Sequence, residues 1–317
     1  MNLLPVCIDM DGSIPSQKQL VPHLVEIVPL HSEQKNLRLW ANKRGLKIAQ
    51  EVIQALREKH PEPWLAFLGS GDFHHMTALL LETLSQEVRP VTLVLIDNHP
   101  DWFVTWPPYH CGNWVSQVVK LPWVKKIFLI GQDSSDISGG HFWSAPFKEL
   151  CSGRIHLYPY ARKKARVLLK WPSATLGVYR SVRRFYGVDL YFDTMSEKDS
   201  EEFFGDLAVE LKDENIYISV DKDCLRQDVA LADWEQGRLD LPTLRYGIEQ
   251  LMKTSRVIGA DICGEQAPEP LEGIFKRIDS GRVFKKPSIF TESNKQHQET
   301  NLSLLKAFSA CSLEIKI

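Results

Sequence analysis

Two clusters of acidic and imidazole side chains each follow directly after an apolar stretch of the chain. Asp97-Asn-His-Pro-Asp101 comes after residues 91–96, and Asp221-Lys-Asp223 comes after residues 216–220. Because side chains alternate across an extended chain, we expect the ligands within each cluster to point to one side. Four carboxylates at the ends of buried strands would repel one another and lose hydration, so they would either take up protons or bind cations.

The donor atoms in these clusters indicate which cations they suit. They are the carboxylates and imidazole of Asp97, His99, Asp101, Asp221 and Asp223, with no cysteine among them. This set suits two hard-to-borderline divalent ions that share bridging oxygens, Mn²⁺ before Zn²⁺. The sequence therefore predicts a centre with two Mn²⁺ per chain, in which other divalent metals are also acceptable.

Short β-branched stretches alternate with stretches of helical period, and this rhythm predicts how the clusters are positioned. We expect strands at residues 6–8, 64–68, 91–96, 126–130, 155–157, 216–220 and 256–262. We expect helices at residues 37–59, 76–84, 113–120, 241–254 and 302–308. The pattern predicts an α/β fold of three layers, α-β-α, around a mostly parallel, doubly wound sheet. Ligands of such sheets bind beyond the carboxyl ends of the strands, where Asp97 and Asp221 fall.

Composition limits the class of protein. The chain has 317 residues, 44% of them apolar, and a formal net charge of −2. We expect one domain over residues 1–317 and a small-molecule substrate, with no nucleic acid or membrane as partner. Six scattered cysteines, no basic N-terminal start and no apolar run of about 18 residues predict a cytoplasmic protein with reduced thiols.

Two further segments stand out by composition. The charges of residues 154–184 are all basic and those of residues 189–214 are mostly acidic. We interpret this segregation as a surface excursion whose halves neutralise each other or a neighbouring subunit, the alternative being a face that binds an anion. Residues 291–300 are polar, and we expect a loop there before the last helix.

Three motifs together resemble those of the ureohydrolases, the superfamily of arginases, agmatinases and formiminoglutamases. Asp97-Asn-His-Pro-Asp101 is similar to the family's Asp-Ala-His-x-Asp, and Ser219-Val-Asp-Lys-Asp223 to its Ser-x-Asp-x-Asp. Gly69-Ser-Gly-Asp-Phe-His-His75 is similar to its Gly-Gly-Asp-His, and the three occur in family order. The resemblance implies an arginase-like fold and hydrolysis of a linear C–N bond in a guanidino, ureido or formimino compound by a metal-bridging hydroxide.

The resemblance also implies a place for each ligand. Asp97 and Asp221 would bridge the two metals, and His99 and Asp223 would complete the second site. Asp101 would complete the first site together with a histidine, and would also orient the attacking water.

That histidine is either His74 or His75, because Phe73 occupies the place where the family's ligand would follow Asp72. We favour His75, since it directly precedes the expected helix from Met76. The neighbouring histidine would then orient a ligand or belong to the core.

The departing amine needs a proton, and a histidine is suited to supply it. His110 resembles the His-Gly found downstream of the metal motif and is either this proton shuttle or a structural residue. A competing register lays Cys111-Gly-Asn113 over the substrate-binding Ser-Gly-Asn of arginases. Asn113 would then contact substrate, and Val115 would stand in the shuttle position. The two registers exclude each other.

Two more acids are implied to contact the substrate. Glu265 resembles the family's substrate-binding glutamate, although it lies one residue later, and a carboxylate can clamp a guanidinium. Asp136 falls where the family places an acid near the substrate amine, and a helix cap is the alternative. The aromatic stretch 102–109 replaces a polar loop of arginases, and we expect it to make an apolar wall.

Three alternatives remain beside a ureohydrolase. Asp9-Met-Asp11-Gly-Ser resembles the opening of haloacid-dehalogenase-type phosphatases, but no later lysine and acidic pair follows, so we interpret both aspartates as turn or rim residues. Histone-deacetylase-like enzymes share the architecture and use a His-His pair like His74-His75, but they lack the extra aspartates. A metal-binding protein of this fold without turnover is the third. The resemblance also implies a homo-oligomer without fixing its size.

Overall fold

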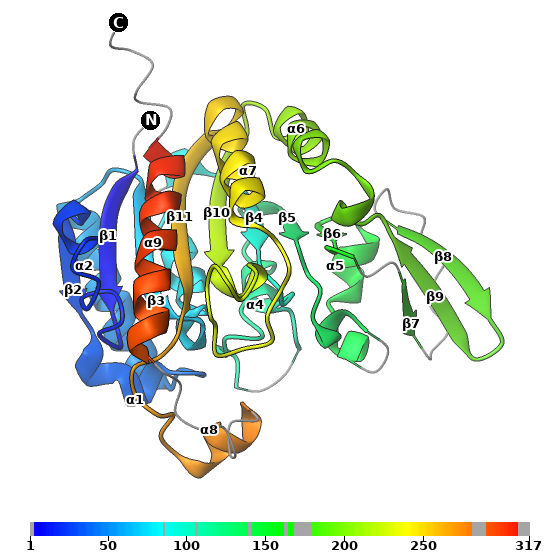
Figure 1. Ribbon diagram of the computed structural model, residues 1–317. Coiled ribbons are helices and arrows are strands. Elements are labelled where there is room, and N and C mark those ends of the chain that lie inside the picture. Colours follow the sequence, from blue (N-terminus) through cyan, green and yellow to red (C-terminus); the bar gives the residue numbers. More distant parts are fainter. Residues whose placement is uncertain are drawn as a thin grey trace, which may run out of the picture.

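An eight-stranded sheet with the order β2-β1-β3-β11-β10-β4-β5-β6 forms the centre of the molecule (Figure 1), and each pair of neighbouring strands is parallel. The computed structural model describes residues 3–84, 86–104, 107–138, 141–161, 164–167, 179–280 and 290–309. Helices cover both faces of the sheet, which confirms the expected three-layer α-β-α fold.

The strands of the large sheet are β1 (Leu4–Asp9), β2 (Glu26–Pro29), β3 (Trp64–Ser70), β4 (Val91–Ile96), β5 (Val124–Ile130), β6 (Ile155–Tyr158), β10 (Asn215–Asp221) and β11 (Arg256–Glu265). A small antiparallel sheet contains β7 (Lys164–Val167), β8 (Tyr179–Arg184) and β9 (Gly187–Phe192). The helices are α1 (Gln34–Leu37), α2 (Lys43–Lys59), α3 (Met76–Glu82), α4 (Val115–Val118), α5 (Phe147–Cys151), α6 (Ser200–Glu210), α7 (Leu241–Thr254), α8 (Ile274–Asp279) and α9 (Phe290–Ser309). No helix in these described ranges has the length and apolar character needed to cross a membrane.

Burial explains why the central strands are nearly continuous apolar stretches of sequence. Every residue of β3 and of β4 is buried, as expected for parallel strands covered by helices on both faces. Helices α2, α3 and α4 lie on one face, while α6, α7 and α9 lie side by side on the other. The predicted helix at residues 241–254 is confirmed as α7. It begins after Asp240, whose side chain accepts a hydrogen bond from the Thr243 amide.

The loop predicted at residues 291–300 is wrong, because this segment belongs to the 20-residue helix α9. Its polar residues Ser293, His297 and Thr300 are buried, and the last two bond to the backbone of another segment, whereas Lys295 and Glu299 are exposed. His297 Nε2 lies 2.9 Å from the Leu231 carbonyl oxygen, and Thr300 Oγ1 donates to the Val229 carbonyl oxygen at 2.8 Å. The polar composition thus reflects buried polar partners from elsewhere in the chain.

The segregated charges meet in the small sheet, which extends away from the main sheet (Figure 1). Asp189 on β9 is contacted by the cationic side chains of Lys164, Arg166 and Arg184 at 2.8–3.0 Å. Within the described residues, Asp189 therefore pairs with the basic segment as predicted, whereas Glu210 and Glu214 of the acidic segment pair with Lys126 and Lys125. Residues 168–178 of the basic segment lie outside the described ranges.

Candidate metal centre

The three ligand motifs meet at one edge of the large sheet. Asp97 directly follows β4, Asp221 is the last residue of β10, and His74 lies between the 3-10 turn that follows β3 and helix α3. Strands β3, β10 and β4 are parallel with only β11 inserted between β3 and β10, so their carboxyl ends share an edge. The sheet therefore brings the ligands together where the sequence placed them.

The first of two side-chain groups is centred on His74. Its Nδ1 atom lies 3.0 Å from Asp101 Oδ2, 3.2 Å from Asp97 Oδ2 and 3.5 Å from Asp221 Oδ2. All four side chains are buried. This group has the composition expected for the first metal position.

The second group contains His99, Asp223 and the other oxygen of Asp97. His99 Nδ1 lies 2.8 Å from Asp223 Oδ2 and 3.8 Å from Asp97 Oδ1. Asp97 thus presents one oxygen to each group, which is the arrangement that a bridging carboxylate requires. Asp221 reaches the first group by Oδ2, while its Oδ1 accepts from the Asp223 amide at 2.9 Å.

His74, and not the favoured His75, is the histidine that lies among the carboxylates. The extra residue Phe73 is accommodated in the 3-10 turn Gly71–Phe73, which turns His74 toward the site. His75 is the N-cap residue of helix α3 and belongs to none of the ligand groups, and neither of its buried ring nitrogens has a hydrogen-bond partner among the described residues. Burial lowers the pKa of His75 to about 3.

Burial of the carboxylates makes the group suited to cations. Burial, together with the charges of Asp223 and Asp101, raises the pKa of Asp97 well above its usual range. Burial and Asp223 raise the pKa of Asp221 to about 7. Two facing atoms, His74 Nδ1 and Asp97 Oδ2, are buried without a hydrogen-bond partner. Divalent cations between these atoms would satisfy both and offset the repulsion, so the residues fit the metal centre implied by the sequence.

Hydrogen-bond donors from the surrounding loops hold the carboxylates in place. Trp114 Nε1 donates to Asp101 Oδ2 at 2.7 Å, and the Asn98 amide donates to Asp223 Oδ1 at 3.2 Å. Asp101 adopts a φ of 45°, an uncommon conformation that directs its carboxylate toward His74. The candidate ligands are therefore oriented without any metal.

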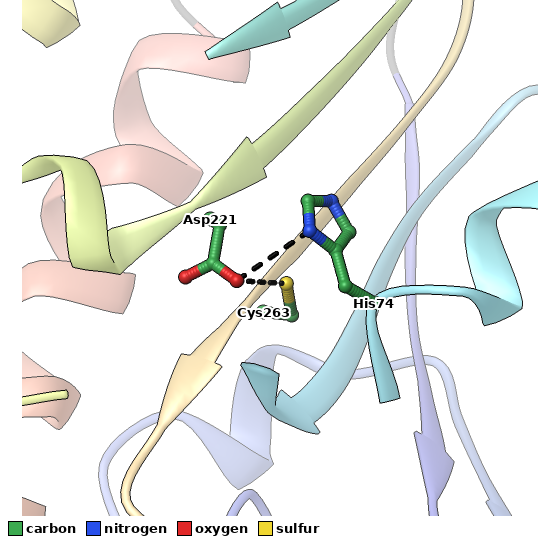
Figure 2. A group of neighbouring side chains, drawn as sticks. All are labelled: His74, Asp221 and Cys263. Atoms are coloured by element: carbon green, nitrogen blue, oxygen red, sulfur yellow. Dashed lines mark hydrogen bonds and ion pairs between the residues drawn. The ribbon is translucent and has the colours of Figure 1, made fainter. Parts of the chain in front are cut away.

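Cys263 on β11 is a member of the site that the sequence reasoning missed. Figure 2 shows its sulfur beside Asp221 and His74, and the distance from Sγ to Asp221 Oδ2 is 3.2 Å. Cys263 pairs with Asp221 in the parallel register of β10 and β11. The sequence places Cys263 beside Asp221 only if β10 and β11 are known to be neighbours in this register.

A cavity of about 550 Å³ opens over the two groups. Most of its ionisable lining residues are acidic, and none of its described lining residues is a lysine or arginine. The lining comprises Gly71, Asp97, His99, Asp101, Phe103, His110, Cys111, Gly112, Asp136, His141, Asp221, Asp223, Trp234, Glu235 and Asp279.

His110 lies at this cavity and is paired with an acid from helix α8. Its Nδ1 accepts from the Gly112 amide at 2.9 Å, so the proton is assigned to Nε2, which lies 2.7 Å from Asp279 Oδ2. The ring also stacks on Trp40. Asp279, which the sequence reasoning missed, comes from a segment with no recognisable motif.

Asn113 is not among the described residues that line the cavity, and its predicted role in substrate binding stays a prediction. Its Nδ2 donates to the Pro107 carbonyl oxygen at 2.6 Å, and its Oδ1 accepts from the His110 amide at 2.9 Å. Asn113 thus holds the turn that presents His110, in agreement with the register that favours His110. Asp136, by contrast, lines the cavity, and burial raises its pKa.

Glu265 is not among the described lining residues either, and its predicted roles in catalysis and substrate binding stay predictions. It is paired with Lys222, accepts from Asn301 Nδ2 at 2.7 Å, and lies 3.2 Å from His297 Nδ1. The register of β11 against β3 shifts between Cys263 and Glu265, and Gly264 there has a φ of 93°. This bulge breaks the alternation of side chains and turns Glu265 toward helix α9.

The structure also bears on the two aspartates near the N-terminus and on the aromatic stretch 102–109. Asp9 and Asp11 are turn residues, because they accept hydrogen bonds from the Gly12 and Ser13 amides respectively. Of the aromatic stretch 102–109, Phe103 lines the cavity, as expected for an apolar wall.

Within the same stretch, Trp102 is buried and packs edge-on against Phe142 instead. Thr105 and Trp106 lie outside the described residues.

Known proteins resemble this chain more in fold than in sequence. No protein-family model matches the sequence. An uncharacterized protein of Thermotoga maritima is 25% identical over 274 residues, which cover 82% of this chain and 85% of that protein.

Solved structures decide the fold. Proclavaminate amidino hydrolase from Streptomyces clavuligerus aligns with a TM-score of 0.60 and 11% identity over 97% of this chain and 91% of that chain. Arginase from Bacillus subtilis aligns with a TM-score of 0.58 and 12% identity over 96% and 98%. This chain has the ureohydrolase fold.

A third solved structure of this fold differs in the reaction that its name states. Formimidoylglutamase from Bacillus subtilis aligns with a TM-score of 0.58 and 12% identity over 97% of this chain and 87% of that chain. The ureohydrolase fold therefore carries proteins named for different substrates.

Proposed function

We propose that the protein is a dinuclear metal hydrolase of the ureohydrolase superfamily that cleaves the linear C–N bond of a guanidino- or formimino-type small molecule. Water would release urea from a guanidino compound, or formamide from a formimino compound, together with an amine. The observation that carries the proposal is the position of Asp97, whose two oxygens face two separate groups of metal-type ligands on the floor of a cavity.

The charge of the cavity supports a cationic substrate. Asp136, Glu235 and Asp279 line it in addition to the candidate ligands, so it remains acidic after two divalent ions are bound. A guanidinium or amidinium group would interact favourably with these carboxylates, and a carboxylate can bind it through two parallel hydrogen bonds.

Each side chain would have a defined task in hydrolysis. Two bound divalent ions would act as Lewis acids and lower the pKa of a water molecule. Asp101, fixed by Trp114, would orient that water. His110 Nε2 and Asp279 Oδ2 share a hydrogen bond at the cavity, so this pair would take up the proton released by the attacking water and deliver it to the departing amine nitrogen.

Metal analysis and product release test the proposal. We expect two divalent ions per purified chain, and urea or formamide from a panel containing arginine, agmatine, guanidinobutyrate, guanidine and formiminoglutamate. Asp97→Asn should lose both metal and activity. Asp136→Asn is the matched control, since Asp136 lines the same cavity outside both ligand groups: it should keep both ions and raise KM.

A metal-binding protein of the same fold without turnover is the second candidate. It is favoured by Glu265 and Asn113, two predicted substrate contacts that bond elsewhere in the protein. Two ions per chain with no product from any compound in the panel would support it. Acetate release from acetylated amines would instead support the deacetylase-like alternative.

A further inference from the structure

A thiol lies among the atoms that would hold the first metal ion. Cys263, Asp221 and His74 come from β11, β10 and the turn before α3, and they converge in Figure 2. Cys263 Sγ lies 3.2 Å from Asp221 Oδ2, and this oxygen lies 3.5 Å from His74 Nδ1. The three ligand atoms all lie within 4.8 Å of one another, and all three residues are buried.

The local structure directs the thiol toward the site. Asp261 and Cys263 alternate with Ile262 on β11, so they point to the same side of the sheet, where Asp261 accepts from Ser219 at 2.8 Å. Gly264 follows with a φ of 93°, and a Cβ there would stand 2.4 Å from Asp221 Oδ1. The missing side chain lets Asp221 approach β11 and therefore Cys263.

A buried nitrogen without a hydrogen-bond partner is a second observation that points to a bound metal ion. His74 is 1% exposed, and its Nδ1 has no hydrogen-bond partner although Nε2 lies 2.9 Å from Ser219 Oγ. The unpartnered nitrogen faces the carboxylates and belongs to the group that contains the sulfur. Nitrogen, oxygen and sulfur donors are therefore directed at one position.

We propose that Cys263 is a sulfur ligand of the metal position at His74, and that this position therefore selects Zn²⁺, Co²⁺ or Fe²⁺ over Mn²⁺. Thiolate ligands favour the softer ions, whereas Mn²⁺ prefers carboxylate and water. Metal binding replaces the S–H bond by a metal–sulfur bond, and the proton leaves to solvent. The inference rests on the metal centre of the proposed function and revises its predicted metal.

The competing arrangement leaves Cys263 as a neutral thiol that only donates a hydrogen bond to Asp221 Oδ2. The bound ion would then have oxygen and nitrogen ligands alone. The two arrangements differ in a property that can be measured directly on the metal-loaded, full-length protein.

Spectroscopy of the Co²⁺-loaded and Zn²⁺-loaded chain separates them. We expect a near-ultraviolet sulfur-to-cobalt charge-transfer band, and X-ray absorption with a sulfur scatterer at about 2.3 Å in the Zn²⁺ form. The band should disappear in Cys263→Ser and Cys263→Ala. Cys111→Ser is the matched control and should keep it, because Cys111 lines the same cavity but belongs to none of the ligand groups. A first shell of oxygen and nitrogen alone in the wild type would overturn the proposal.

Competition between metals measures the selectivity. Cys263→Ser should reduce the preference for Zn²⁺ over Mn²⁺ by at least about tenfold. Removing a residue that only hydrogen-bonds to a metal ligand already lowers metal affinity by about this factor. An unchanged preference contradicts the proposal. Sulfur ligation without product release would support this inference and contradict the proposed function. Product release without sulfur ligation would contradict this inference and support the proposed function.

Discussion

Ser219 Oγ lies 2.9 Å from Nε2 of His74, and this contact decides which imidazole nitrogen faces the carboxylates. The single hydroxyl proton of Ser219 is donated to Asp261 Oδ1 at 2.8 Å, so Ser219 accepts the Nε2 proton of His74. The lone pair of Nδ1 therefore points at Asp97, Asp101 and Asp221. Such an arrangement is repulsive unless a proton or a metal ion lies between these atoms.

Ser219→Ala should weaken metal binding without removing any ligand. The ring of His74 would lose the partner that fixes its tautomer and orientation, and losses of roughly 10–100-fold in metal affinity are typical for such partners. Competition with a chelator measures the affinity. Ser255→Ala is the control, since it also removes a hydrogen-bonded serine hydroxyl, one that donates to the Leu211 carbonyl oxygen away from the ligands. Equal affinities for the two variants would contradict this role of Ser219.

Removing one partner of the buried ion pair between Lys222 and Glu265 should destabilise the fold strongly. The side chains of Lys222 and Glu265 are 0% and 2% exposed, so Glu265→Gln leaves an uncompensated buried ammonium. We expect the free energy of unfolding to fall by about 3–5 kcal/mol in urea denaturation. The double variant Lys222→Met/Glu265→Leu should recover much of this loss. A double variant no more stable than the single one would contradict the electrostatic explanation.

The stability of the metal-free protein should carry a pH signature of Asp221. Its pKa is about 7 in the fold against an ordinary value of 3.8, so between these pH values the folded state holds a proton that the unfolded state has released. The contribution of Asp221 is present below pH 4 and is lost as the pH rises toward 7, with a slope of at most about 1.4 kcal/mol per unit.

The difference in unfolding free energy between wild type and Asp221→Asn isolates this contribution. It should shift in favour of the variant from pH 4 to pH 7 in the presence of a chelator. A difference that does not vary with pH would show that burial leaves Asp221 ionised in the metal-free fold.

Gly264→Ala should damage both the fold and the centre. Its Cβ would stand 2.4 Å from Asp221 Oδ1 and 2.6 Å from the Lys222 backbone nitrogen, and its φ is positive. We expect overpacking to add about 1–3 kcal/mol to the conformational cost, and metal binding to weaken because Asp221 must move.

Gly153→Ala is the control for the conformational cost alone. Gly153 has a φ of 72° and no heavy atom within 4 Å of the added Cβ, so only about 1–2 kcal/mol should be lost and metal binding should persist. Thermal unfolding and metal titration of both variants test this. Equal losses at the two positions would contradict a specific approach of Asp221 to β11.

Local sequence determined most strands of the large sheet and the position of the candidate metal centre. Residues 91–96 are apolar except for Thr92, which is typical of a strand covered on both faces, and the acids follow where such a strand ends. Because parallel strands carry their ligand-binding ends at one edge, Asp97 and Asp221 were predicted to lie close together without knowledge of any contact. The helix Leu241–Thr254 was equally predictable, since its cap and its apolar period are local.

The tertiary structure alone decided which side chains enter the site. A 3-10 turn absorbs Phe73 and brings in His74 in place of His75, while a bulge at Gly264 sends Glu265 to Lys222 and leaves Cys263 beside Asp221. The buried polar residues His297 and Thr300 of helix α9 bond to backbone carbonyls of Leu231 and Val229, which lie in a segment distant along the chain. A shift of one residue reverses the direction of a side chain. Whether a turn or bulge makes that shift depends on how neighbouring strands pack, and the spacing of residues along the sequence does not reveal that packing.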